Sequence, residues 1–483
     1  MNQLNLKFSS LFPTEMFGFF KDVKFSLKAL INKQKTKVLF AEIDSDLADV
    51  LFSFLTLPLG KIVRILKKHY GDKALVFGSI TTLYDGLSNL ESSHFWTEGG
   101  KQMLLDPTSS FIDECRRLKL DIGDNQPIKY YTCENLNCSY HRTSNLGMYY
   151  DTVRCDCGKQ LKKEIPVRNV PKADDGEVFT IKTATFLISD DLQILPNVTA
   201  SIKQIISDLG HMDIDGTELR NVSIGFNEIM DLLKHSLLSP TPLSNLVLNK
   251  QISYKPGTSF NRIWNKATIN YITTLKVILQ KSTKKFLFAE AEDDFVEFIS
   301  SFLIISLGGV EHLLGANTSL KNIDNLYRSA AFPIDGKYLS QGRYRLIWPN
   351  IPYGYLSKNG LFSLTEEGAP KLCYCKASST NEEYLYCSKK LICDIKCPRG
   401  QFNYIKGPRK YMVKDDLTVT PLCLTSYINT LNEQKISLSD VDELELKIGS
   451  QEASSILKAS LSSTFALSMG LNHLIMKQPK QEK

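Results

Sequence analysis

The segment Leu39-Phe40-Ala41-Glu42 recurs unchanged as Leu287-Phe288-Ala289-Glu290, 248 positions later in the chain. The match extends without a gap over residues 26–60 and 274–308, where 14 of 35 positions are identical. Self-similarity at a fixed offset is the sequence signature of an internal repeat. The sequence therefore predicts two similar tandem domains that arose by internal duplication.

A second block repeats near the end of each copy. Asp190-Asp191-Leu192 matches Asp415-Asp416-Leu417 at an offset of 225, and 9 of the 20 residues at 224–243 recur at an offset of 224. Because the offset changes between the two blocks, the copies differ in length in their middle parts. We expect an N-terminal extension at 1–22, a first repeat domain at 23–249 with a Cys-rich middle at about 130–160, and a second, diverged repeat domain at 250–483.

Four features of the chain resemble those of a known family: the segments Lys37–Glu42, Phe54–Gly60 and Asp190–Pro196, and the cysteines of Cys133–Cys157. Together they resemble the plant family catalogued as domain of unknown function 674, and the likeness covers nearly the whole chain. The resemblance implies a plant origin and brings no reaction with it.

The repeated blocks begin with strand-like runs. Within residues 25–43, two such runs flank a polar turn and predict a hairpin. If paired residue numbers sum to 70, apolar residues share one face and Lys28 lies opposite Glu42. The same register in the second copy pairs Lys276 with Glu290, which indicates cross-strand ion pairs. A catalytic Lys–Glu pair is the alternative interpretation.

After each hairpin, apolar residues recur with helical spacing. Asp46 stands where an N-cap is expected, with Asp49 three residues later as in a capping box, so these acids are explained without a metal or catalytic role. Pro58 should end or bend the helix. The second copy has Ser306 instead, which predicts a straighter helix.

The repeated late blocks mix short strands with helices. Asp190-Asp191 and Asp415-Asp416 fall between strand-like runs and predict turns, with a divalent cation site as the alternative. Hairpins at the start of both blocks favour the α+β class with antiparallel pairing.

Four cysteines lie within 25 positions: Cys133, Cys138, Cys155 and Cys157. Zinc binds four thiolates in a tetrahedron, and two short turns can supply them. The gaps of four residues and one residue differ from the Cys-x2-Cys of zinc ribbons. We expect one structural zinc here, with His141 as a substitute ligand; reduced thiols in an ordinary hairpin are the alternative.

The second copy has a differently spaced set of cysteines, which is a weaker candidate for a second zinc site. It consists of Cys373, Cys375, Cys387, Cys393 and Cys397. A redox role is less favoured for either set, because the chain has no Cys-x2-Cys.

Charge and hydropathy limit the partners of the chain. Fifty-eight Lys and Arg against 52 Asp and Glu leave a net charge of +6, which gives no large field of one sign. The first 20 residues lack the apolar core of a secretory signal, and no apolar run approaches the roughly 20 residues of a membrane span. We expect an intracellular, cytoplasmic protein without a membrane partner; the nucleus stays open as a location.

The chain lacks the motifs of phosphate-binding loops, dinucleotide sites, zinc proteases and serine hydrolases. We therefore expect a non-catalytic binding or scaffold protein, with a protein as the candidate partner. One alternative is an enzyme with its site in the inter-domain cleft, using Glu42 or Glu290. Another is a zinc-assisted nucleic-acid binder using Arg343 and Arg409, although the modest charge makes nucleic acid an unfavoured partner.

Overall fold

The computed structural model describes residues 23–71, 76–135, 138, 146–168, 177–209, 216–250, 272–357, 360–376, 383–387, 395–399 and 403–476. The expectations for residues 1–22, His141 and Cys393 lie outside these ranges. Helices and mostly antiparallel strands mix along the chain, so the α+β class is confirmed. None of the helices in the described ranges has the length and hydropathy that a membrane crossing needs.

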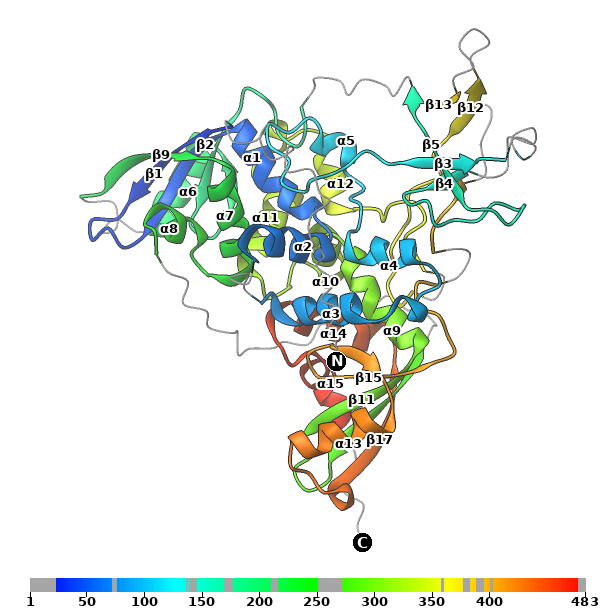
Figure 1. Ribbon diagram of the computed structural model, residues 1–483. Helices are drawn as coiled ribbons and strands as arrows, with labels where there is room; N and C mark the ends of the chain where they lie inside the picture. Colours follow the sequence, from blue (N-terminus) through cyan, green and yellow to red (C-terminus); the bar gives the residue numbers. More distant parts are fainter. Residues whose placement is uncertain are drawn as a thin grey trace, which may run out of the picture.

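Two five-stranded sheets lie far apart, with a layer of helices between them (Figure 1). The first sheet has the order β8-β7-β2-β1-β9 and consists of Phe25–Ile31 (β1), Val38–Asp44 (β2), Thr185–Ser189 (β7), Ile194–Pro196 (β8) and Glu218–Ile224 (β9). The second has the order β16-β15-β11-β10-β17 and consists of Thr273–Gln280 (β10), Phe286–Glu292 (β11), Lys410–Val413 (β15), Val419–Pro421 (β16) and Val441–Ile448 (β17). Strands from corresponding repeated blocks hold the same position in the strand order of the two sheets.

The predicted hairpin register is confirmed in both sheets. Lys28 pairs with Glu42 and Lys276 with Glu290 across antiparallel strands. An irregularity at the end of each hairpin sets Ile31 opposite Val38, one residue from the expected partner. Because side chains alternate between the faces of a strand, this register places Leu27 and Leu275 in the main buried cluster, whereas Ile278 and Phe288 of the second hairpin lie in a separate one.

The helices lie between and around the sheets, and in both parts of the chain they begin with one helix, a 3-10 turn and two further helices. The first part contains Ser45–Phe52 (α1), the 3-10 turn Ser53–Thr56 (η2), Leu59–Tyr70 (α2), Gly78–Asn89 (α3), Ser92–His94 (η4), Glu98–Leu105 (α4), Ile112–Cys115 (α5), Thr199–Leu209 (α6), Phe226–Leu238 (α7) and Pro242–Val247 (α8). The second contains Asp293–Ser300 (α9), Ser301–Ile304 (η7), Leu307–Leu314 (α10), Lys321–Ala331 (α11), Gly336–Tyr338 (η8), Arg343–Ile347 (α12), Leu424–Glu433 (α13), Leu438–Asp440 (η9), Ser450–Ser462 (α14) and Ala466–Ile475 (α15).

The first helix of each part breaks at the same place. Pro58 precedes α2, as its missing N–H predicts. The expectation of a straighter helix at Ser306 is wrong, since α10 starts directly after it and the Ser306 hydroxyl accepts a hydrogen bond from Gly309 N at 3.2 Å. Serine at an N-cap thus starts a new helix where proline does in the first part.

Two helices pack against the sheet of the other part of the chain. Helix α3 lies on α14 and β16, and α11 lies on α7 and β8. The Ser79 hydroxyl donates to Ser463 O at 2.7 Å, and Asn322 Nδ2 donates to Ser239 O at 2.6 Å. The contacts are therefore reciprocal, because Ser239 and Ser463 hold matching positions of the late block.

One continuous cluster of buried apolar side chains includes residues of both parts, among them Leu27, Leu55, Leu275 and Leu303. Tandem domains usually each have a hydrophobic core of their own, whereas the described residues of both parts share this one. The cause is the close packing of α2 and α10 against the neighbouring η7 and η2 turns. The division at residues 249 and 250 remains a prediction.

Two small sheets lie apart from the helical layer, to the right in Figure 1. One has the order β14-β4-β3-β5 and consists of Tyr130–Cys133 (β3), Leu146–Met148 (β4), Leu161–Ile165 (β5) and Ile395–Lys396 (β14). The other has the order β12-β13-β6 and consists of Val167–Arg168 (β6), Leu372–Lys376 (β12) and Glu383–Cys387 (β13). The parallel pairs β14–β4 and β13–β6 join strands that are more than 200 residues apart in the sequence.

Candidate metal centre

The structure brings together the four cysteines that the sequence singled out. The Sγ atoms of Cys133, Cys138, Cys155 and Cys157 all lie within 4.8 Å of one another, and those of Cys133 and Cys157 are 3.6 Å apart. Four sulfurs at about 2.3 Å from a tetrahedral zinc are about 3.8 Å from each other. The cluster therefore has the dimensions of a four-thiolate metal site.

Two turns supply the thiols in pairs. Cys133 ends β3, and the Cys138 N–H donates to Asn135 O at 3.0 Å in the turn that follows. In the second turn the Cys155 N–H donates to Lys159 O at 2.8 Å, and Gly158 has a φ of 85°, a conformation that favours glycine. Glycine thus lets a turn with only one residue between its cysteines close.

The thiols differ in exposure and in acidity. Cys133 and Cys155 are buried beside Val153 and Leu161, whereas Cys157 is exposed. The Lys159 N–H and the neighbouring thiols of Cys138 and Cys133 lower the pKa of Cys157 to about 7. The hydrogen bond to Cys157 raises the pKa of Cys138 to about 12. The lowered pKa of Cys157 favours its thiolate near neutral pH. The thiolate is the form of cysteine that binds a metal.

The cysteine turns are attached to the distant part of the chain. Ile395 of β14 pairs with Leu146 of β4, and Lys396 forms an ion pair with Asp156, which lies between the two cysteines of the second turn. The region expected as an insert of the first domain is therefore completed by a strand from the second.

The second set of cysteines is only partly described. Cys373 is buried in β12 and Cys397 is half-buried after β14. Cys375 and Cys387 lie on paired strands, β12 and β13, but their side chains, like Cys393, fall outside what the structure describes. A second metal site remains a prediction.

Glu42 and Glu290, the acids named for an enzyme, lie in ion pairs on the sheets. Glu42 is 3.4 Å from Lys28 Nζ and also accepts a hydrogen bond from Asn197 at 3.2 Å. Glu290 is 4.0 Å from Lys276 Nζ and pairs with Lys410. The predicted cross-strand ion pairs are confirmed at both sites.

The capping box expected for the first helix is wrong. The side chain of Asp44 caps α1 through Leu47 N at 2.8 Å, and Asp46 is half-buried in an ion pair with Lys119. Asp49 is buried, and this burial raises its pKa to about 7. Its carboxylate accepts a hydrogen bond from Phe179 N at 3.1 Å. The helix begins two residues earlier than the apolar spacing indicated, with Asp44 rather than Asp46 as its N-cap.

At the position equivalent to Asp49, Glu297 is fully buried. Its carboxylate accepts hydrogen bonds from Tyr404 N and Ile405 N, both at 2.9 Å, and from the Ser357 hydroxyl. Burial raises the pKa of Glu297. The carboxylates of Asp49 and Glu297 thus bind backbone N–H groups of segments that lie more than 100 residues later in the chain. No local sequence pattern indicates such a role.

The paired aspartates have turn roles, as the sequence favoured. Asp190 accepts hydrogen bonds from the N–H and the hydroxyl of Ser244, both at 2.8 Å. Asp415 makes the same two contacts with Ser468, at 2.8 and 2.6 Å. In each part, then, the first aspartate of the turn anchors the start of a later helix.

A cleft of about 810 Å³ separates the helical layer from the two small sheets. Its lining comes from both parts of the chain: Thr108–Ser110, Ile112, Asp113, Arg116, Pro127–Tyr130, Met148, Tyr149, Glu164–Val167, Arg345, Pro352, Tyr353, Glu367, Gly368 and Pro370–Leu372. Neither Glu42 nor Glu290 is among these residues. Sequence reasoning missed this group, because its members are far apart in the chain and do not repeat.

The basic and aromatic residues considered for nucleic acid are separated. Arg343 donates to Ala330 O at 2.8 Å and lies over the ring of Tyr344, while Arg345 is held in the cleft by Glu114 and Glu367. Arg409 precedes β15, on a different element. The sequence cluster is thus divided between several surfaces.

Fold and site together define a mixed α+β protein with a four-cysteine cluster that could bind a metal ion. Residues 21–451 match the family described as protein of unknown function DUF674, and the chain belongs to that family. The resemblance noted from the motifs is therefore confirmed. No curated protein and no solved structure matches the chain.

Proposed function

We propose that this protein is a non-catalytic binding or scaffold protein whose four-cysteine cluster holds one structural zinc ion. The observation that carries the proposal is the approach of Cys133, Cys138, Cys155 and Cys157 to within 4.8 Å. Four thiolates close the coordination shell of zinc and leave no position for a substrate. Zinc in such a site stabilises the segment that binds it.

The position of the cluster supports a scaffold role. The cysteine turns belong to the first part of the chain, and β14 of the second part completes their sheet. A metal that holds the turns would also preserve the contact between Lys396 and Asp156. Zinc binding would thereby stabilise the connection between the two parts.

We further propose that the two parts arose by internal duplication. The equal strand order of the two large sheets supports this, as do the equal registers of their hairpins. Most of the repeated acids hold structural contacts: Glu42 and Glu290 in ion pairs, Asp190 and Asp415 on serines. The repeated acids therefore favour a structural role for the repeated residues over a repeated catalytic site.

Elemental analysis of the purified protein tests the metal. We expect about one zinc per chain in the wild type and its loss in Cys133→Ser and Cys157→Ser. Cys423→Ser is the matched control, since that exposed thiol caps α13 and should leave the zinc content unchanged. A folded wild type that contains no zinc would refute the metal site.

A further inference from the structure

We infer that the cleft between the helical layer and the small sheets binds a small amphipathic anion, with an apolar or aromatic body and one acidic group. The inference rests on the binding role proposed above and does not depend on zinc. Its volume of about 810 Å³ lies within the range of small-molecule sites.

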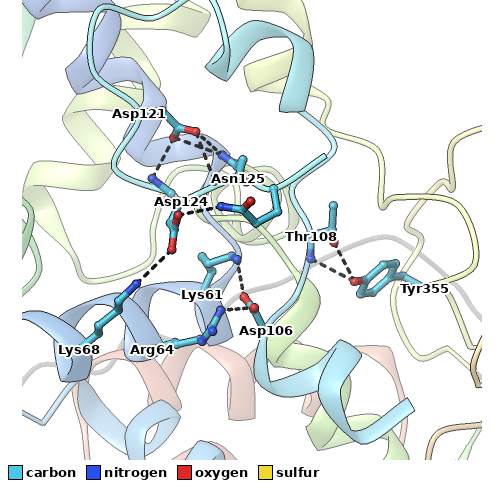
Figure 2. Close-up of polar contacts among 11 residues, drawn as sticks. Lys61, Arg64, Lys68, Asp106, Thr108, Asp121, Asp124, Asn125 and Tyr355 are labelled. Atoms are coloured by element: carbon cyan, nitrogen blue, oxygen red, sulfur yellow. Dashed lines mark hydrogen bonds and ion pairs between the residues drawn. The ribbon is translucent and has the colours of Figure 1, made fainter. Parts of the chain in front are cut away.

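One wall of the cleft is fixed before any ligand arrives. Asp106 pairs with both Lys61 and Arg64, and the Thr108 N–H donates to the hydroxyl of the buried Tyr355 at 3.1 Å. Figure 2 shows these contacts together with those of the following loop. A wall held in this way loses little conformational entropy on binding.

The loop that follows this wall is held by its own network. Asp121 accepts hydrogen bonds from Gly123 N at 2.9 Å and from the Asn125 amide at 3.1 Å. Asp124 pairs with Lys68 of α2 at 3.2 Å (Figure 2). The path from Asp106 to the cleft residues at 127–130 is thus fixed at several points.

The inner surface of the cleft is apolar and aromatic. Tyr130 of β3, Met148 of β4 and Ile165 of β5 come from the cysteine-bearing sheet, and Tyr353 and Leu372 come from the second part of the chain. Such a surface favours the apolar body of a ligand and gives little to a fully polar one.

Charged groups line the cleft as well, with cations in excess. Arg116, Lys129, Arg345 and Lys371 are cationic, against the carboxylates of Asp113, Glu164 and Glu367. The charge of Arg345 is already neutralised, because Arg345 binds Glu367 at 2.7 Å and also pairs with Glu114, which lies outside the lining. The cleft therefore has other cations to offer an acidic group.

The other cations of the cleft form weaker ion pairs within the protein or none. Arg116 is 3.4 Å from Asp113, whose side chain is 78% exposed, and Lys129 is 3.2 Å from Glu164, where both side chains are 53% exposed. Lys371 has no ion-pair partner within the described ranges. Exposed pairs contribute little free energy, so a ligand anion can replace the carboxylates at low cost.

Titration of the full-length protein with 8-anilinonaphthalene-1-sulfonate, followed by fluorescence and calorimetry, tests the site. We expect one saturable site per chain, and weaker binding of the neutral analogue N-phenyl-1-naphthylamine. Arg116→Gln and Lys371→Gln should each weaken sulfonate binding about tenfold, the effect of one charge-assisted hydrogen bond. Arg117→Gln is the control, because Arg117 donates to Glu177 O and does not line the cleft.

A second variant tests the position of the site independently of charge. A Cβ on Gly368 would meet no atom within 4 Å, so Gly368→Trp should fold normally and add an indole to the lining of the cleft, where it takes the place of a ligand's aromatic body. We expect it to abolish binding of both probes. Equal affinity for the neutral analogue or for a cationic naphthylamine, or binding that survives Gly368→Trp in a folded protein, would overturn the inference. A zinc-free wild type that still binds the sulfonate would refute the metal site alone.

Discussion

Pro58 and Ser306 face each other in an antiparallel bridge, although 248 positions separate them in the sequence. Beside them, Leu59 N donates to Ile305 O at 2.9 Å and Leu307 N donates to Leu57 O at 3.0 Å. Pro58 and Ser306 hold the same position in the two repeated segments, so each part presents the same surface to the other. A two-fold interface between identical chains has this property. The junction is thus arranged like a dimer interface within one chain.

The glycines that follow this bridge allow the two parts to approach. A Cβ on Gly308 would lie 2.6 Å from Leu346 O, closer than real contacts permit, and 3.1 Å from Leu55 O, which is a tight contact. We expect Gly308→Ala to lower the free energy of unfolding by about 1–3 kcal/mol, as overpacking does in other cores. Urea denaturation measures the change. Gly368→Ala, where a Cβ meets nothing within 4 Å, is the control, and equal stability of the two variants would contradict the packing argument.

Asp49 should make stability depend on pH. Its folded pKa is about 7, raised mainly by burial, whereas an unfolded aspartate titrates near about 3.9. The folded state therefore binds more protons between these values, and the contribution of Asp49 to stability is present below about pH 4 and is lost as the pH rises to about 7.

Asp49→Asn should remove that part of the pH dependence, because its amide oxygen can still accept from Phe179 N without a charge. Stability curves of the variant and the wild type from pH 4 to 8 should diverge toward higher pH, in favour of the variant. Asp46→Asn, at a half-buried position on the same helix, serves as the comparison. Parallel curves for Asp49→Asn and the wild type would show that Asp49 carries no such penalty.

Glu311 should also make the protein less stable as the pH rises, as Asp49 does. This carboxyl is buried, its Oε1 accepts from the Thr318 hydroxyl at 3.1 Å, and its Oε2 has no partner among the described atoms. Burial and the neighbouring Asp324 raise its pKa well above the usual value. Glu311→Gln replaces the protonated acid with a neutral amide and should increase thermal stability at pH 8 more than at pH 5.

The matched variant for Glu311→Gln is Glu433→Gln, which changes an exposed acid at the end of α13. Thermal melts of both proteins at the two pH values provide the measurement. A loss of stability in Glu311→Gln at pH 8 would mean that the carboxyl is ionised and stabilising in the folded protein.

The continuous core predicts that the two parts depend on each other. Residues 1–249 expressed alone would lose the packing of α11 on α7 and β8 and would expose part of the apolar cluster. We expect this fragment to self-associate, and to form a stable one-to-one complex when it is co-expressed with residues 250–483. Sedimentation velocity distinguishes the outcomes. A folded monomeric fragment would show instead that the predicted domains are independent.

Local patterns in the sequence determined much of the secondary structure. The hairpin register follows from alternation, because a slip by one residue would expose the apolar side chains of Leu27 and Leu275. The aspartates at 190 and 415 lie in turns for the reasons that favour this residue in turns. The spacing of the four cysteines indicated their grouping, since short turns place nearby thiols on the same side.

Only the tertiary structure decided how the two parts of the chain meet. Residues far apart in the chain decide three features of the structure. These are the packing of α3 and α11 against the other part of the chain, the burial of Asp49 and the cleft around Arg345. A turn or a strand register is set by neighbours within a few positions, and the sequence alone determined these, whereas the N-cap of the first helix lies at Asp44 and not at the expected Asp46. A shared core depends on which apolar faces exclude the most water together, a free energy that belongs to the whole chain.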